Sequence, residues 1–275
     1  MVAQFVFNSL ASVGVMDRTI IQPGQRGQRA FMGWTCRVLV QKIEMLQSSS
    51  GLELSEGEHI VTIGDGDTEV LRSLDQVLPL MNCGEVARVV LKGRGGDLLA
   101  CELSLLEITQ LEEFLGLDDE QRLRRALRHK ERAAALFKES RFVDAFHRFA
   151  HAAKDLMCTE TILLDGEVSE VQPTLSKLFS NMAECQMRLL HHEEAQDLAQ
   201  RALALEPKDV KALYRAASAS WGLGDTDKAN GFLDRLFDIE PKNAAALNLR
   251  AKVGEKVAEY EKNYEAMMKR VFALY

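Results

Sequence analysis

The fold of this chain is decided by residues 176–241, which read SKLFSNMAECQMRLLHHEEAQDLAQRALALEPKDVKALYRAASASWGLGDTDKANGFLDRLFDIEP. This stretch repeats itself at an interval of 34 residues, because Ala195 and Pro207 recur as Ala229 and Pro241. Small side chains at fixed positions let two helices approach closely, and a proline cannot continue a helix. The stretch therefore predicts two consecutive helical hairpins. Six further pairs keep the interval: Phe179/Leu213, Met182/Ala216, Ala183/Ala217, Gln186/Ser220, Ala199/Leu233 and Ala202/Leu236.

A 34-residue period of paired helices resembles the tetratricopeptide repeat (TPR) family. An earlier, lengthened repeat is expected, because Ala145 precedes Ala195 by 50 residues, which is one period of 34 plus 16. The surplus fits the stretch Thr159–Pro173. We expect an all-α TPR domain over residues 118–275, with units at 122–158, 174–207 and 208–241.

A long helix at 243–275 follows the last unit. Stacked repeats need a cap on their exposed end, and the first half of this helix is expected to supply it. The apolar tail, which includes Met267 and Met268, has two interpretations. Burial against its own repeats is favoured over docking of a partner, and the two are not exclusive.

Composition narrows the function classes. The chain of 275 residues is 47% hydrophobic and 27% charged with a net charge of −7, which fits a globular protein and argues against nucleic acid as a partner. Its five cysteines have no C-x-x-C spacing, so neither a disulfide framework nor a zinc site is indicated. No apolar run approaches membrane-spanning length, and the first residues make a poor signal peptide. We expect a cytosolic location, with the nucleus as an additional one.

The N-terminal part predicts an α+β domain. Residues 1–28 are interpreted as a lead-in with one strand near Thr19–Gln22, and residues 29–117 as the domain, which a hinge at Leu115–Leu117 ends. One strand around residues 36–43 is expected to be buried on both faces for part of its length, and others at 59–63, 86–92 and 98–108. A single apolar stripe over residues 70–81 predicts a helix that Asp67 or Thr68 caps.

Two glycine-rich segments are interpreted as turns. Gly64–Asp67 alternates glycine and aspartate but lacks the length and closing glutamate of a calcium loop and the lysine of a phosphate loop. Gly93–Gly96 is better explained as a hairpin turn than as an anion site. No cofactor or metal is therefore predicted.

Residues 70–81, VLRSLDQVLPLM, together with Gly84, Glu85 and Ala87, resemble the central helix and following turn of the FK506-binding-protein (FKBP) immunophilins. Residues 102–108, ELSLLEI, resemble the last strand of that family. The resemblance implies a prolyl isomerase fold, some members of which carry TPR tails with a lengthened first repeat.

The chain departs from the family at the isomerase pocket. The positions of its pocket tyrosine, floor tryptophan and last-strand phenylalanine are Val40, Leu74 and, nearby, Cys101. The loop that carries a second pocket tyrosine is missing between the last two strands. Because this catalysis encloses a proline in a dry aromatic pocket, we predict a degenerate FKBP-like domain without isomerase activity.

Three polar side chains share one face of the repeats. Asn181 and Arg215 are 34 residues apart and so hold the same position in neighbouring units, and Lys211 lies one helical turn before Arg215. An amide, an ammonium and a guanidinium in one groove are suited to a carboxylate. The alternative is that the cations only solvate a helix and the amide satisfies a turn.

The TPR domains of Hsp90 and Hsp70 co-chaperones hold Glu-Glu-Val-Asp chain ends in a clamp of two lysines, two asparagines and one arginine. Asn181, Lys211 and Arg215 resemble three of these, and Lys130 resembles the lysine of the first repeat. The first-repeat asparagine is Ala134 here. The resemblance implies a non-catalytic co-chaperone that binds the C-terminal peptide of Hsp90, or Hsp70 as the alternative, and links it to client or adaptor proteins. An active prolyl isomerase and a TPR scaffold for another ligand are the competing hypotheses.

Overall fold

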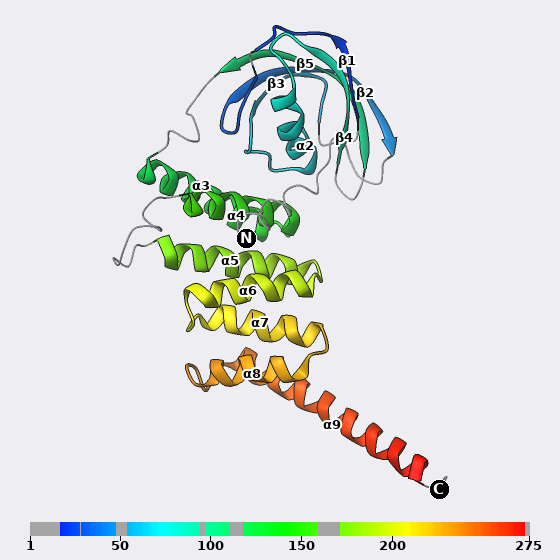
Figure 1. Ribbon diagram of the computed structural model, residues 1–275, viewed down its shortest axis with the longest axis vertical. Helices are drawn as coiled ribbons and strands as arrows, with labels where there is room; N and C mark the ends of the chain where they lie inside the picture. Colours follow the sequence, from blue (N-terminus) through cyan, green and yellow to red (C-terminus); the bar gives the residue numbers. More distant parts are fainter. Residues whose placement is uncertain are drawn as a thin grey trace. The chain divides into compact units, whose positions relative to one another are not determined.

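A computed structural model describes residues 17–27, 29–47, 54–93, 97–109, 118–158 and 171–272 (Figure 1). The chain divides into two compact units, residues 1–125 and 126–275. The first is built on an antiparallel sheet and the second on helices, which confirms the predicted fold class. The predicted hinge at 115–117 and most of the predicted insertion at 159–173 lie outside the described residues.

The sheet has five strands, and every pair of neighbours in it is antiparallel. The strand order is β1-β4-β5-β2-β3, so β5 lies in the centre and the first strand of the chain forms an edge. The strands are β1 Asp17–Gln22, β2 Thr35–Gln47, β3 Gly57–Thr62, β4 Val86–Lys92 and β5 Leu98–Thr109.

The strand β2 buries one face only, which corrects the prediction of burial on both faces. Cys36, Val38 and Val40 have no exposed surface, whereas the alternate residues Arg37 and Gln41 are exposed. The outward guanidinium of Arg37 lies 3.0 Å from the carboxylate of Glu107 on β5. The apolar side chains at alternate positions of this strand therefore lie in the core, and Arg37 and Gln41 between them lie on its exposed face.

The helix α2 (Glu69–Val77) covers the buried face of the sheet (Figure 1). The hydroxyl of Thr68 accepts a hydrogen bond from the Leu71 amide at 3.3 Å and caps the helix, as one of the two predicted residues. The α-helix does not reach residue 81 as expected, but passes into the 3₁₀ turn η1 (Leu78–Leu80). Pro79 explains the change, because its ring clashes with the carbonyl four residues earlier and it has no amide hydrogen.

The strand β1 lies inside the predicted lead-in, so part of residues 1–28 belongs to the sheet. Its Arg18 forms an ion pair with Glu85, whose side chain is fully buried. The Glu85 carboxylate also accepts hydrogen bonds from the backbone and side-chain amides of Asn82, at 3.1 and 3.2 Å. Burial would raise the pKa of Glu85, but the bonds from Arg18 and Asn82 outweigh it and lower that pKa.

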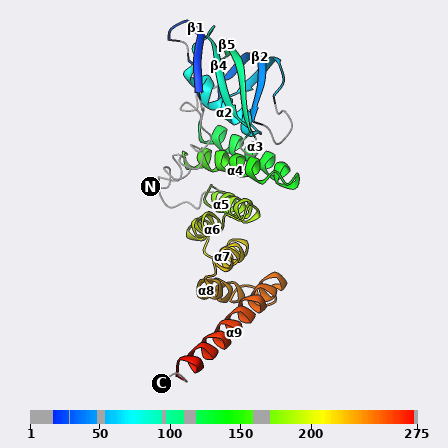
Figure 2. The same cartoon turned by 90° about the vertical axis from the view of Figure 1, so that its right-hand side faces the viewer.

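The C-terminal unit is a succession of antiparallel helical hairpins closed by one long helix (Figure 2). Each hairpin packs on the next, and α9 packs on α7 and α8. No helix in the described ranges combines the length and the apolar character that crossing a bilayer requires. The helices are α3 Asp119–Lys138, α4 Phe142–Met157, α5 Val171–Arg188, α6 His192–Leu205, α7 Val210–Gly222, α8 Thr226–Phe237 and α9 Ala244–Phe272.

The three hairpins turn in the same way. The second residue after the first helix has a positive φ in each case, at Ser140 (59°), Leu190 (63°) and Gly224 (79°). The next amide reaches back five residues to close the helix, from Arg141 to Leu136, His191 to Gln186 and Asp225 to Ser220, at 3.0, 3.0 and 2.9 Å. These bonds form the motif that commonly ends helices, and here they set the direction in which the second helix leaves.

The long helix α9 behaves differently along its length. Ala246 and Val253 in its first half have no exposed surface, in agreement with the expected cap. Farther on, Tyr260 is 74% exposed and Tyr264 58%. Met267 is also 52% exposed, so burial of the tail against its own repeats was wrong for this residue.

Candidate functional site

The residues predicted to form a clamp come from the first helices of the hairpins. Asp209 begins α7, because its carboxylate accepts hydrogen bonds from the amides of Lys211 and Ala212 at 2.9 and 3.1 Å. This cap places Lys211 in the first turn of α7 and Arg215 one turn later. Asn181 lies on α5, on the neighbouring hairpin.

These three side chains line a single cavity of about 550 Å³. Its wall comes from α3, α4, α5, α7 and the beginning of α9, all within the C-terminal unit. Aromatic rings from three helices alternate with the polar groups. The cavity is therefore a mixed surface that offers positive charge beside apolar area. Its remaining lining residues are Ala134, Phe137, Lys138, Phe149, Glu184, Val210, Tyr214, Asn243 and Ala245.

Lys130, the fourth predicted clamp residue, does not line this cavity. It is half-buried on α3, one turn before Ala134, which does line it. The helix α3 instead contributes the exposed Lys138 to the cavity wall. The structure thus brings together three of the four predicted residues and adds a lysine that the repeat arithmetic did not consider.

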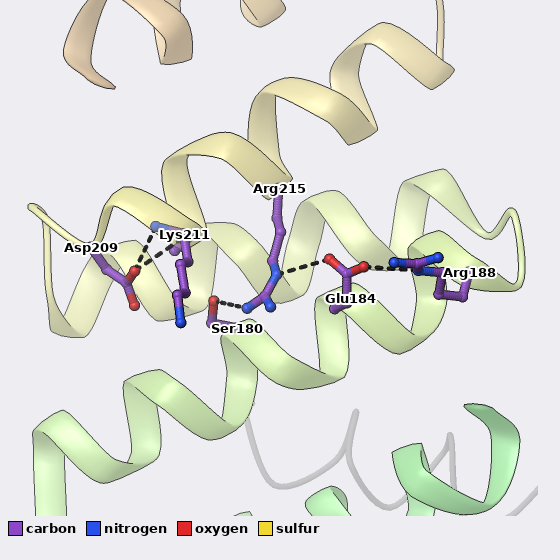
Figure 3. A network of polar contacts seen from close by, with 7 residues as sticks. Ser180, Glu184, Arg188, Asp209, Lys211 and Arg215 are labelled. Atoms are coloured by element: carbon purple, nitrogen blue, oxygen red, sulfur yellow. Dashed lines mark hydrogen bonds and ion pairs between the residues drawn. The ribbon is translucent and has the colours of Figure 1, made fainter. Parts of the chain in front are cut away.

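Lys211 and Arg215 differ in their surroundings. Lys211 is exposed, and its ammonium forms no ion pair with any residue in the described ranges. The side chain of Arg215 is only 14% exposed, and its Nε donates to Oε2 of Glu184 at 3.1 Å. Its Nη1 donates to the hydroxyl of Ser180 (Figure 3). The lysine is therefore available to a ligand, whereas the arginine already has two partners.

Glu184 was missed by the sequence reasoning. Its Oε1 accepts from Nε of Arg188 at 3.0 Å, so its two oxygens bind two different guanidinium groups (Figure 3). The spacing held the signal, because Glu184 follows Asn181 by three residues and so lies on the same face of α5. What the spacing did not reveal is that this carboxylate reaches the arginine of the next repeat.

The degenerate pocket positions of the sheet unit belong to its hydrophobic core. Val40, Leu74 and Cys101 have no exposed surface and lie in one cluster. Burial raises the pKa of the Cys101 thiol to about 12, so the group is neutral at ordinary pH. Aliphatic and thiol side chains fill the place where the FKBP resemblance puts aromatic rings.

These features define a chain in which an FKBP-like sheet unit precedes TPR hairpins. Residues 191–253 match the family model described as the tetratricopeptide repeat. The chain is similar to the FK506-binding protein-like of Mus musculus, with 28% identity over 243 residues. That alignment takes in 87% of this chain and 66% of the mouse protein, so the chain spans just under two thirds of this relative's length. The two comparisons together agree with the resemblance to the FKBP immunophilins and to the tetratricopeptide repeats.

Among solved structures, residues 1–211 of CG17282 share 23% identity with a TM-score of 0.51 and cover 64% of this chain and 91% of that one. At this identity the likeness concerns the fold alone. The first TPR of Spaghetti (RPAP3), solved with the HSP90 peptide SRMEEVD, shares 24% identity with a TM-score of 0.42 and covers 50% of this chain and 95% of that one. The peptide is a feature of that complex.

Proposed function

We propose that the C-terminal unit binds the free chain end of a Glu-Glu-Val-Asp tail, as carried by Hsp90, and that the chain is a non-catalytic co-chaperone. The observation that carries the proposal is the single cavity lined by Asn181, Lys211 and Arg215. In this role the sheet unit and α9 present other proteins to the chaperone. We also propose a cytosolic location, with the nucleus as an additional one.

The chemistry of the cavity suits an acidic chain end. The Lys211 ammonium is a point charge for the terminal carboxylate, and the Asn181 amide can donate to or accept from the peptide backbone. The guanidinium of Arg215 offers a forked pair of donors to a second carboxylate. Phe137, Phe149 and Tyr214 supply apolar area for a valine or methionine side chain.

Calorimetric titration with acetylated Met-Glu-Glu-Val-Asp tests the proposal. We expect binding by the parent chain and its loss in the double variant Lys211→Ala, Arg215→Ala. Lys252→Ala is a matched control, because this exposed lysine of α9 does not line the cavity. The same peptide with an amidated C-terminus should bind far more weakly, since the clamp needs the free carboxylate. Equal binding of both peptides would favour a TPR scaffold for another ligand.

The first-repeat cation has two candidates. The family resemblance points to Lys130, and the cavity lining points to Lys138. Single alanine variants of the two lysines, titrated with the same peptide, tell which of them contributes. Parallel titrations with Hsp90 and Hsp70 tail peptides rank the two chaperones as partners.

The proposed absence of isomerase activity is supported by the buried core that Val40, Leu74 and Cys101 help to form. A dry aromatic pocket is what favours the twisted amide in this reaction, and these positions carry no ring. A protease-coupled assay on a Leu-Pro peptide provides the test. Acceleration that FK506 inhibits would establish the competing hypothesis of an active prolyl isomerase.

A further inference from the structure

The wall of the candidate groove contains a carboxylate that a receptor for acidic peptides does not need. Glu184 lines the same cavity as Asn181, Lys211 and Arg215. Its side chain is 23% exposed, and it is bound to Arg215 rather than directed into solvent. The group that the ligand's carboxylate needs is thus already paired with a carboxylate of the protein.

We propose that Glu184 is an internal competitor for Arg215, which the acidic chain end must displace in order to take Nε of the guanidinium. The inference rests on the proposed function and deepens it, because it names the residue that sets the affinity of the groove. A peptide carboxylate that takes Nε of Arg215 replaces one charge-assisted hydrogen bond by another. The net gain from Arg215 is therefore smaller than in a groove where the arginine is free.

Arg188 gives the displaced carboxylate somewhere to remain. Oε1 of Glu184 already accepts from Nε of Arg188 at 3.0 Å, and Oε2 is the oxygen that binds Arg215. Release from Arg215 consequently leaves Glu184 paired within its own helix (Figure 3). Arg188 is 56% exposed and does not line the cavity, so an effect of this residue on peptide binding that disappears when Glu184 is replaced passes through Glu184.

The contacts between α5 and α7 define a competing structural explanation. Glu184 and Ser180 both belong to α5, and together they hold the guanidinium of Arg215 on α7. A residue with only that tie to make would affect the stability of the helical unit and leave the peptide affinity unchanged. The two explanations therefore differ in the quantity that each predicts will change.

The test titrates acetylated Met-Glu-Glu-Val-Asp into the parent chain and into Glu184→Gln. The neutral amide keeps the shape of the side chain, and we expect about ten-fold tighter binding, equivalent to one net charge-assisted hydrogen bond. Glu193→Gln is the matched control, because this exposed carboxylate of α6 does not line the cavity and its removal changes the net charge equally. Its affinity should equal that of the parent.

A second variant tests the coupling. Arg188→Ala should weaken peptide binding several-fold in the parent background, because Glu184 then has Arg215 as its main partner. The same substitution should have no effect when combined with Glu184→Gln. Thermal unfolding of each variant shows that the comparison is made between folded chains.

The outcomes separate the two proposals. Binding by the parent with no gain in Glu184→Gln overturns the internal competitor and leaves the chaperone function standing. Binding by Glu184→Gln alone supports the competitor. A lack of binding in both chains overturns the proposed function and, with it, the competitor.

Discussion

Lys211 and Arg215 belong to one proposed clamp, yet their alanine variants should behave differently. Lys211 is exposed and makes no ion pair with the described residues, so Lys211→Ala should leave the stability of the helical unit within about 0.5 kcal/mol of the parent. Its loss should weaken binding of acetylated Met-Glu-Glu-Val-Asp by roughly ten-fold or more, since a hydrogen bond to a charged group contributes about 1.5–3 kcal/mol.

Arg215→Ala should lower stability as well. The guanidinium is 14% exposed and binds Glu184 and Ser180, so its removal takes away two hydrogen bonds between α5 and α7. Because Glu184 keeps Arg188 and water screens the pair, we expect a loss of about 1 kcal/mol, or about 2–4 °C in melting temperature for a domain of this size.

Calorimetry measures the affinities, and far-ultraviolet circular dichroism measures the melting temperatures. Lys252→Ala should match the parent in both. The exposed position of Lys211 also makes its contribution sensitive to ionic strength, because salt screens charges in solvent. Lys211 has no part in a clamp if Lys211→Ala binds as tightly as the parent chain, and the two residues do not differ as described if both variants lose stability to the same extent.

Three further predictions concern stability. Gly224→Ala should destabilise the helical unit by about 1 kcal/mol, because the φ of 79° is unfavourable for alanine even though no atom lies near the added Cβ. Gly231→Ala in α8, where the Cβ also meets no atom, should stabilise the unit by a similar amount. The melting temperatures of the two variants should change in opposite directions. The pKa of His151 is well below 6.5, first because the imidazole is buried and then because of the charges of His129, His147, Arg148 and Lys154. The contribution of His151 to the free energy of unfolding should therefore be complete above pH 6.5 and should fall below that pH by at most about 1.4 kcal/mol per pH unit. His151→Gln should remove this contribution, as measured by urea titrations across pH. Arg18→Ala should destabilise the sheet unit by about 3 kcal/mol, because it leaves Glu85 buried without its cation. Lys42→Ala breaks the exposed Lys42–Glu102 pair and should cost under about 1 kcal/mol. Equal losses of stability in denaturant unfolding would contradict the difference between the buried and the exposed pair.

The repeat period carried most of what the sequence could predict. Ala195 and Ala229 hold the same position in neighbouring repeats, and so do Asn181 and Arg215. These correspondences depend only on helical spacing, which local sequence determines. The sequence predicted a strand near Thr19–Gln22, but it did not predict that this strand joins the sheet, because the pairing of β1 with β4 connects residues about 70 positions apart. The sequence contains Pro79, which can end an α-helix, but the apolar stripe continues to Met81 and led to the prediction of a longer helix.

The candidate site shows the same division. Repeat arithmetic placed Asn181, Lys211 and Arg215 on one face, and the structure has them around one cavity. The repeat arithmetic did not predict that Glu184 binds Arg215, because an ion pair depends on how far the side chains reach between two hairpins and on competing partners. Lys138 was not predicted either, because the family resemblance pointed to Lys130 as the lysine of the first repeat.

The three hairpin turns have a consequence for engineering. Serine, leucine and glycine occupy the same left-handed position at Ser140, Leu190 and Gly224, and the backbone bond that follows has nearly the same length each time. The same main-chain turn is thus formed with three different residues at this position. Whole repeats of this chain should accordingly be transplantable between positions, as modules from which grooves with other arrangements of charge can be assembled.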